Sequence, residues 1–506
     1  MCVVRAEETE ATTRTREPLR RPRALVAGLS VVVLTVAILQ TAVVPVLAII
    51  ADQLNESTVA TSWAVTANLL AAAAATPLIG RLADLHSKKR VLLVVLAVVL
   101  AGSLLVVLAV VLAGSLLAAT TSSLALLVVG RVLQAASFAL YPVGIAILRE
   151  ELTEDRMVSA MTVLSGTLGF GGGAGLVVVG LLVNHDANYH RVFWLTTAFT
   201  VAVIAIVVLV VPSRPRSASG TIDWLGAAGL AAGLSAVLLA VTQGNTWGWA
   251  SVRTLACAVC GVAVLVGWWL WERRARQPLV STQMLSRRPI LLTNLATIFV
   301  GMGLYFAFLG LTLFVQIPRE AAGYGFGATV LEASVVYLLP GALAGFVVAL
   351  VSGRFIDRFG ARPVLVAAAA AGISGFLLTA LAHTAPWQVV VASILANAYI
   401  ALGYGALPAL VVSEVSAGET GVATSMNAIA RTIGSSAAAA LVAVLLGRTI
   451  DGSTVPQESS FVAIFLGGAV TAALALVLIA LSRVRAGAIE TVEARYESRA
   501  MNHEWG

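Results

Sequence analysis

The sequence predicts an all-α integral membrane protein with fourteen transmembrane spans, built as two six-helix bundles plus two inserted helices. Three observations lead to this fold class. Of the 506 residues, 59% are hydrophobic and 11% are charged, whereas a soluble domain carries about 25% charged residues. Apolar runs of about 20 residues, enough for a helix to cross a bilayer, fill most of the chain and do not alternate as barrel strands do. One short charged segment also occurs twice, once in each half.

The apolar runs form two sets of six spans with a pair between them. The first set is expected at residues 25–50, 59–80, 91–112, 123–148, 158–183 and 192–212. The inserted pair is expected at 222–242 and 252–271, and the second set at 290–315, 328–352, 363–382, 387–412, 420–446 and 461–482. The chain is therefore divided into an N-terminal tail (1–24), a first bundle (25–212), the inserted helices with their linkers (213–289), a second bundle (290–482) and a C-terminal tail (483–506).

The distribution of arginine predicts the orientation in the membrane. Because the number of spans is even, both tails lie on the same side. Six arginines precede the first span, and the loops on that side carry most of the others, whereas Arg191, Arg253, Arg319 and Arg448 fall on the opposite side. Loops rich in Lys and Arg stay in the cytoplasm, so both termini are predicted to be cytoplasmic. The net charge of +7 then reflects topology, and no nucleic-acid partner is expected because the basic residues form no binding patch.

The repeated segment organises the two halves. GRLADLHSKKRV occupies Gly80–Val91, and GRFIDRFGARPV occupies Gly353–Val364. Each copy joins two apolar spans, and the copies share Gly80/Gly353, Arg81/Arg354, Asp84/Asp357 and Val91/Val364. In membrane proteins an internal repeat of this kind marks transporter halves that move against each other around a central site.

The pattern Gly-x-x-x-Asp-Arg-x-Gly-Arg/Lys after the second span of each half resembles the signature loop of the major facilitator superfamily. The second copy fits this pattern, whereas the first has Leu85 in place of Arg and Ser87 in place of Gly. Twelve plus two spans, and the segment Asp223–Gly226 that opens the first extra span, are similar to the fourteen-span drug–proton antiporter branch. The resemblance covers nearly all of residues 24–482, and it implies the major-facilitator fold and proton-coupled export.

Two arginines deep in predicted spans are candidates for proton coupling. Arg131 lies in the fourth span and Arg431 in the thirteenth. A cation at such depth costs roughly 2.5–3.5 kcal/mol, so it normally faces a partner or a water-filled cavity. The resemblance places Arg131 in an Arg-x-x-x-Gly element associated with proton coupling, with Ala135 at the Gly position. Alternatively, Arg131 only ties helices together through backbone carbonyls. For Arg431 both kinds of role remain open, and Asn427, one turn before it, is expected to share its face.

A proton-driven exporter also needs an acidic group that titrates within reach of its cavity. The resemblance implies an Asp in the first span, but this chain has Gln40 there. Glu332, about one turn into the tenth span, is the best intramembrane candidate, and a plain helix-N-terminal acid is its alternative. Asp84 and Asp357 lie at the cytoplasmic boundary and are expected to hold a gate through hydrogen bonds to loop arginines and helix N-termini. Proton coupling is thus implied by the resemblance more than by the residues.

A glycine run in the fifth span predicts close helix packing. The segment GTLGFGGGAG contains Gly166, Gly169, Gly171, Gly172, Gly173 and Gly175. So many glycines lower helix propensity, and small residues allow membrane helices to approach closely. The run resembles the Gly-Pro-x-x-Gly-Gly element of the antiporters, with Gly172 at the Pro position. We expect a packing seam between the two halves here.

Polar and aromatic residues near the middle of the spans are candidates for the substrate cavity. They are Gln40, Asn68, Gln134, Tyr141, Asn294, Tyr305, Phe306, Tyr337, Asn397, Tyr404 and Met426. Each either lines the pore or packs between helices. A pocket with apolar and aromatic walls and few polar groups suits a small lipophilic organic substrate.

Other functional classes fit the sequence less well. The five His residues lie in or beside loops, so a membrane enzyme, which needs a nucleophile and base or a metal, is not expected. Cys257 and Cys260 lie in an apolar run without a second ligand pair, and no metal or other cofactor is expected. A receptor or lipid scramblase would leave the repeated loop unexplained. The sequence therefore predicts a transporter.

The predicted protein is an exporter of a lipophilic drug or antibiotic, including a cationic or zwitterionic one, or of a self-made metabolite. It is driven by the proton gradient and acts as a monomer. Thirty arginines against two lysines are typical of bacteria with GC-rich genomes, so the inner membrane of such a cell is the expected location. The alternative, which Gln40 would fit, is a facilitator or a lipid or metabolite exporter without strict proton coupling.

The predicted orientation can be tested by cysteine labelling in intact cells, starting from a cysteine-free variant. Cysteines placed at Asn55, Asn188 or Ser453 should react with an impermeant maleimide from outside. Cysteines at Ser87 or Arg276 should react only after permeabilisation, because arginine-rich loops stay inside. Reversed labelling at two of these positions would contradict the predicted topology.

Overall fold

The computed structural model is helical in every secondary-structure element of its described residues, which are 22–41, 43, 50, 54, 56, 58–115, 123–183, 190–214, 221–448, 450 and 455–482. The first half contains α2 (Pro22–Thr41), α4 (Thr58–Leu85), α5 (Lys88–Ser115), α6 (Ser123–Gln134), η3 (Ala135–Ala139), α7 (Leu140–Glu151), α8 (Glu154–Val183) and α9 (His190–Val210). The inserted pair is α10 (Trp224–Trp247) and α11 (Val252–Glu272). The second half contains α12 (Thr282–Ser286), α13 (Arg288–Gln316), α14 (Arg319–Ala322), α15 (Val330–Glu332), η4 (Ala333–Leu338), α16 (Leu339–Phe359), α17 (Ala361–Leu381), α18 (Pro386–Ser413), η5 (Ala417–Glu419), α19 (Thr420–Leu446) and α20 (Glu458–Leu481).

Helices occupy all fourteen predicted spans, which confirms the predicted fold class. Within the described residues, 13 helical runs are long and apolar enough to cross a membrane by length and composition, and α5, with 28 residues, fills the remaining position. The tenth span begins with α15 and the π-helical segment η4, which leads into α16 just before Pro340. Proline lacks an N–H, so a shifted hydrogen-bond pattern before it is physically reasonable.

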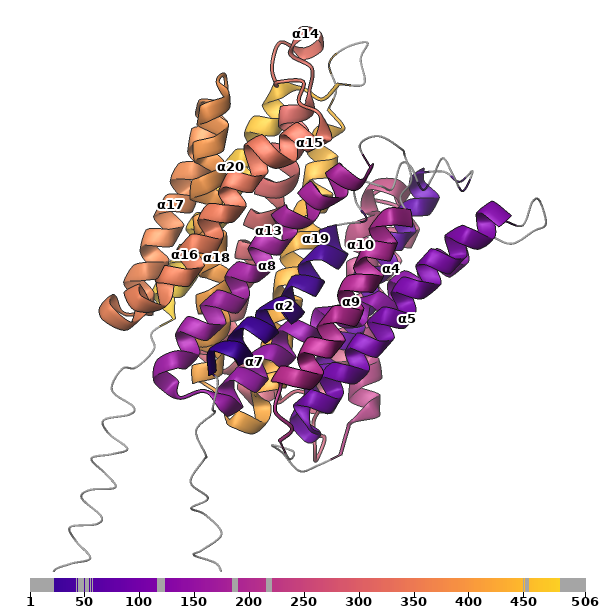
Figure 1. Cartoon of the computed structure of the whole chain (residues 1–506), viewed down its shortest axis with the longest axis vertical. Coiled ribbons are helices and arrows are strands. Elements are labelled where there is room, and N and C mark those ends of the chain that lie inside the picture. Colours follow the sequence, from indigo (N-terminus) through magenta and orange to yellow (C-terminus); the bar gives the residue numbers. More distant parts are fainter. Residues whose placement is uncertain are drawn as a thin grey trace, which may run out of the picture.

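The two six-helix sets form the two sides of one bundle (Figure 1). Helices α16, α17, α18 and α20, orange to yellow, lie on one side, and α2, α4, α5 and α9, indigo to magenta, lie on the other. The sides meet where α8 packs on α16 and where α4 packs on α19. Helix α2 begins and α20 ends at the same, lower end of the view in Figure 1, as an even number of spans requires.

The two inserted helices have different environments. Helix α11 packs mainly on α10 and exposes apolar side chains such as Val252 and Val259, as expected for a helix that faces lipid. Helix α10 packs against both α4 and α19, which belong to different halves. Contacts with both halves therefore place α10 at their junction.

Glycines of α8 allow it to approach α16 closely. A Cβ at Gly166 would overlap the methyl group of Ala349, and a Cβ at Gly173 would lie 2.7 Å from that of Ala342. Gly166 and Gly173 lie two helical turns apart, as do their two partners, so the contacts repeat along one antiparallel face. This is the expected seam between the halves. Gly169 does not take part in this seam, because nothing lies within 4 Å of a Cβ placed there. Gly175 is buried.

Replacing Gly166 with Ala should destabilise the protein by about 1–3 kcal/mol, the usual cost of overpacking. The matched control is Gly169→Ala on the same helix, which meets open space and should be neutral or slightly stabilising because Ala favours helix. Thermal unfolding of the purified variants in detergent measures the difference. Adding Ala349→Gly to Gly166→Ala should restore the melting temperature, and a double variant as unstable as Gly166→Ala would contradict this packing.

Candidate functional site

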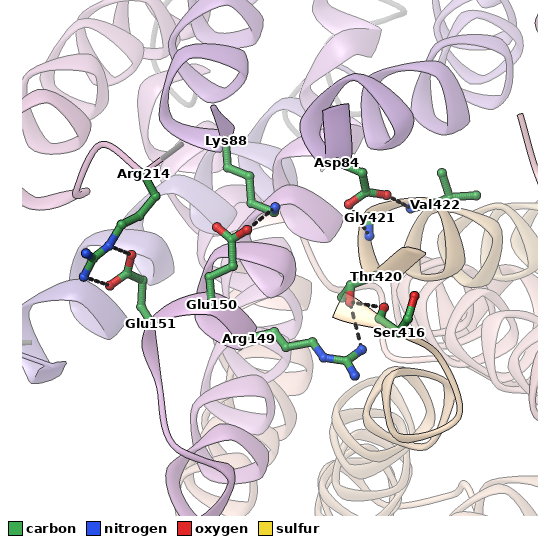
Figure 2. Close-up of polar contacts among 10 residues, drawn as sticks. All are labelled: Asp84, Lys88, Arg149, Glu150, Glu151, Arg214, Ser416, Thr420, Gly421 and Val422. Carbon is green, nitrogen blue, oxygen red and sulfur yellow. Dashed lines mark hydrogen bonds and ion pairs between the residues drawn. The ribbon is translucent and has the colours of Figure 1, made fainter. Parts of the chain in front are cut away.

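Asp84 joins the two halves at one end of the bundle (Figure 2). It lies at the end of α4 and is fully buried. Its Oδ1 accepts a hydrogen bond of 3.0 Å from Gly421 N, and its Oδ2 accepts one of 3.1 Å from Val422 N. Both N–H groups belong to the first turn of α19, where helices have unpaired donors and a partial positive charge. A carboxylate of the first half therefore caps a helix of the second half, as predicted for a helix N-terminus.

Glycines at this crossing explain why the carboxylate can reach. A Cβ at Gly80 would overlap the hydroxyl of Ser425, and a Cβ at Gly421 would lie 2.6 Å from Asp84 Oδ1. The second copy of the repeat has the same role at the other crossing, because a Cβ at Gly353 in α16 would overlap the Ser159 hydroxyl in α8. The shared glycine of the repeat thus serves both contacts between the halves.

A second polar contact crosses between the halves beside Asp84. Arg149 of α7 donates to Thr420 Oγ1 at 2.8 Å and to Val415 O at 2.6 Å. The ion pairs Lys88–Glu150 (2.5 Å) and Arg214–Glu151 (2.7 Å) lie within the first half, and Figure 2 shows both. Among the described residues, no arginine forms a hydrogen bond with Asp84, so this part of the prediction is wrong. Arg149 contacts the second half instead, and Lys88 and Arg214 pair with glutamates.

A cavity of about 430 Å³ lies between the halves, away from the Asp84 end. Asn68 lines it and stands 16 residues before Asp84 in α4, about 24 Å away at 1.5 Å per residue. The wall is mainly apolar and aromatic, with amides, hydroxyls and two arginines. Its polar and aromatic members include Gln40, Thr66, Asn68, Arg131, Phe138, Gln243, Asn245, Tyr305, Phe308, Asn397, Tyr404, Arg431 and Ser435.

A polar layer that joins both halves lies between the cavity and the Asp84 end. The Tyr141 hydroxyl of α7 and the Ser165 hydroxyl of α8 both bond Tyr404 O of α18, at 3.0 and 2.9 Å. The guanidinium carbon of Arg431 in α19 lies 5.0 Å from the centre of the Tyr141 ring and 4.7 Å from that of Tyr404. Tyr404 and Arg431 also line the cavity, so this layer borders it on the side of Asp84. Arg431 is thus held by aromatic faces, while Asn427 bonds Asn294 and Thr297 of α13 instead of sharing its surroundings.

Arg131 is buried among backbone carbonyls. Its side chain is 2% exposed, and it donates to Leu39 O (3.2 Å), Ala64 O (3.3 Å) and Gln134 Oε1 (2.7 Å). These bonds tie α6 to α2 and α4, which is the helix-tying arrangement given above as the alternative. Arg131 also borders the cavity, so the arrangement permits a role in coupling as well.

Only some of the predicted cavity residues line the cavity. Gln40, Asn68, Tyr305, Asn397 and Tyr404 do so. The others lie in helix interfaces: Gln134 bonds Ser103, Tyr141 belongs to the polar layer, Asn294 accepts from Asn427, Phe306 packs beside Gly467, Tyr337 stacks on Phe326 and Met426 packs in a buried cluster. Of the glycine run, Gly169, Gly172 and Gly173 line the wall. A sequence alone does not tell which face of a helix points inward.

The predicted acidic candidates lie away from the cavity. Glu332 is exposed before the membrane-spanning part of its helix, and its Oε2 accepts from Thr329 N (2.9 Å) and Thr329 Oγ1 (3.1 Å). These bonds hold the pKa of the Glu332 carboxyl below its usual value. The placement of Glu332 inside the span is therefore corrected to a capping box, which the sequence Thr-x-x-Glu could have indicated. The side chain of Asp357 lies outside the described part of the structure.

Sequence reasoning missed that α10 lines the cavity. Thr242, Gln243, Asn245 and Thr246 border it. Gln243 bonds Thr66 Oγ1 of the first half at 3.3 Å, and Asn245 bonds Ala440 O of the second half at 3.1 Å. The signal was the polar segment Thr242–Thr246 at the end of an otherwise apolar span.

Comparisons with known proteins agree with this geometry. A family model described as Major Facilitator Superfamily matches residues 29–439. The tetracenomycin C resistance and export protein of Streptomyces glaucescens is 28% identical over 456 residues, which cover 87% of this chain and 78% of that protein. Multidrug resistance protein 3 of Bacillus subtilis is 22% identical over 403 residues, covering 78% and 72%.

The fold is similar to that of solved transporters. The crystal structure of FucP, a Major Facilitator Superfamily transporter in the outward conformation, superposes with a TM-score of 0.61 at 15% identity. The alignment covers 91% of this chain and 100% of that one. At this identity the likeness concerns the fold.

Replacing Asp84 with Asn should loosen the end of the bundle that Asp84 holds. The amide loses the charge that the α19 N-terminus stabilises, and hydrogen bonds to charged groups contribute roughly 1.5–3 kcal/mol. Spin labels at the exposed Arg90 and Ser413, one in each half at this end, report the separation by double electron–electron resonance. We expect a longer-distance population in Asp84→Asn.

The matched control is Asp223→Asn, which removes a helix-capping carboxylate within α10 without crossing between the halves. It should leave the distance distribution unchanged. An unchanged distribution in Asp84→Asn would show that this carboxylate does not hold the halves together.

Proposed function

The chain belongs to the Major Facilitator Superfamily, and on this premise we propose that it exports a small lipophilic organic compound by alternating access, in exchange for protons. The observation that carries the proposal is the central cavity between two halves that are locked together at one end by Asp84. In such a transporter the halves rock about a fixed site, so that the cavity opens to one side at a time.

The Asp84 end is assigned to the cytoplasm. The arginine-rich loops lie at this end, and such loops stay inside. The described conformation is then closed toward the cytoplasm, with the cavity in the half of the membrane nearer to the outside. The protein is proposed to lie in a bacterial inner membrane as a monomer, with both termini inside.

The proposed direction of transport and the proposed substrate class are supported by the residues that line the cavity and by the relatives. The apolar and aromatic lining suits a lipophilic solute. Relatives that cover most of the chain are named for tetracenomycin C resistance and export and for multidrug resistance. We therefore favour export of an antibiotic, a drug or a self-made metabolite over uptake of a nutrient.

A second candidate is export without strict proton coupling. The observation that favours it is that no acidic residue lines the cavity in the described part of the chain, and Gln40 occupies the wall where the antiporter branch has an Asp. Under proton antiport, Asp84 is a buried acid that takes part in the contact between the two halves. Its protonation would remove the charge that caps α19.

Reconstitution in proteoliposomes distinguishes the two candidates. Under proton antiport, an imposed pH gradient should drive uphill movement of a transported antibiotic, and collapse of the gradient with a protonophore should abolish it. Downhill movement of the antibiotic at a rate that does not depend on the pH gradient would support the uncoupled candidate. Absence of any protein-dependent movement across a panel of lipophilic antibiotics would contradict both.

Arg131 tests the coupling mechanism most directly. Arg131→Ala should still reach the membrane folded but lose gradient-driven transport, because the cation that borders the cavity is gone. Arg131→Lys keeps a charge without the planar fork, so it should retain a fraction of the gradient-driven rate. Transport by Arg131→Ala at the wild-type rate with an unchanged pH profile would leave Arg131 a packing residue only.

A further inference from the structure

The charges that border the cavity are all positive. Arg131 and Arg431 line it, and no Asp, Glu, Lys or His is among its lining residues in the described ranges. A cleft with low-dielectric walls and charges of one sign concentrates ions of the opposite sign. The described wall therefore favours a negatively charged occupant and opposes a cationic one.

The two arginines differ in how many of their N–H donors already have a hydrogen-bond acceptor in the protein. Arg131 donates to two carbonyls and a glutamine oxygen and is almost fully buried. Arg431 is half-buried, and its guanidinium carbon lies over the rings of Tyr141 and Tyr404. None of the ion pairs found among the described residues includes it. An aromatic face attracts a cation but carries no net charge, so the charge of Arg431 is not neutralised.

The shape of the Arg431 guanidinium group fits a planar anion such as a carboxylate. A guanidinium has five N–H donors in a rigid fork, which matches the two oxygens of a carboxylate. The guanidinium carbon of Arg431 lies over two aromatic rings, 5.0 Å from the centre of Tyr141 and 4.7 Å from that of Tyr404. The position of Arg431 at the floor of the cavity, next to the layer that joins the halves, places an anion bound there at the bottom of the cavity.

The remaining polar groups of the wall are largely committed to helix contacts. Asn68 donates to Arg131 O, Asn397 donates to Ser393 O, and Gln243 donates to Thr66. The rest of the wall is apolar or aromatic and includes Phe138 and Phe308. Arg431 is therefore the strongest available donor in a largely apolar cavity.

We infer that the substrate is a lipophilic aromatic anion, such as a carboxylate, phenolate or enolate, whose charge pairs with Arg431. This inference rests on the proposed export function and narrows its substrate class. The aromatic body of the compound fills the apolar part of the cavity, and its single acidic group reaches the floor. The same geometry disfavours lipophilic cations.

Matched probes with one ring system test the inference on the purified full-length protein in nanodiscs. The probes are anthracene-9-carboxylate, the neutral anthracene-9-carboxamide and the cation 9-(aminomethyl)anthracene, and isothermal titration calorimetry measures their affinities. The wild-type protein should bind the carboxylate at least about tenfold more tightly than the carboxamide, because a charge-assisted bidentate contact is lost in the neutral probe. The cation should bind most weakly.

Charge-removing variants locate the source of the preference. In Arg431→Gln the carboxylate should lose about tenfold or more in affinity while the carboxamide changes by less than about threefold. Arg431→Lys should keep part of the preference. The matched control is Arg448→Gln, which removes the same charge from an exposed position just after α19 and should bind all three probes like the wild type.

The outcomes separate this inference from the proposed function. A wild-type protein that binds or transports the carboxamide as well as the carboxylate overturns the anion preference and leaves export standing. A preference that survives Arg431→Gln overturns the role of Arg431. A wild-type protein that binds no anthracene probe overturns the inference, and export is then judged separately by the transport of lipophilic antibiotics in proteoliposomes.

Discussion

The structure depends on one contact, in which the buried carboxylate of Asp84 meets the first N–H groups of α19. Each partner needs the other. A buried charge without hydrogen bonds is costly, and the first donors of a helix have no partner within the helix. Both needs are met at once when the halves close at this end. If the halves separate there, water must replace both hydrogen bonds, so opening of this end is linked to its hydration.

Close backbone approach makes this contact possible. Association of helices in lipid relies on packing and hydrogen bonds, since lipid tails are as apolar as the side chains. Glycines at Gly80, Gly166 and Gly353 stand where a Cβ would overlap a residue of the other half. The seams are therefore tight along α4–α19 and α8–α16 toward the Asp84 end, and the space between the halves remains near the other end, where the cavity lies.

The positive charge of the cavity wall, which favours an anionic substrate, also affects the driving force for export. An inside-negative membrane potential moves an anion outward and supplies roughly 2.3 kcal/mol per charge at 100 mV. An anionic substrate would thus leave the cell down the electrical gradient, and its carrier would need no acid in the cavity for this drive. An anionic substrate is consistent with a cavity that is lined by arginines and that has Gln40 in place of an acid. Proton exchange would add to the electrical driving force.

The sequence by itself determined the class of fold, the fourteen spans and the repeat, because span length, apolar composition and a duplicated charged loop are local properties of the chain. It also indicated Asp84, Arg131 and Arg431 as unusual, since charges in or beside apolar spans are costly wherever the helices lie. The tertiary structure decided which residues meet. Asp84 caps α19 across 337 positions of sequence, and α10 enters the cavity wall. These outcomes depend on which face each helix turns inward, and for helices that are apolar all round the sequence carries no period that fixes that face.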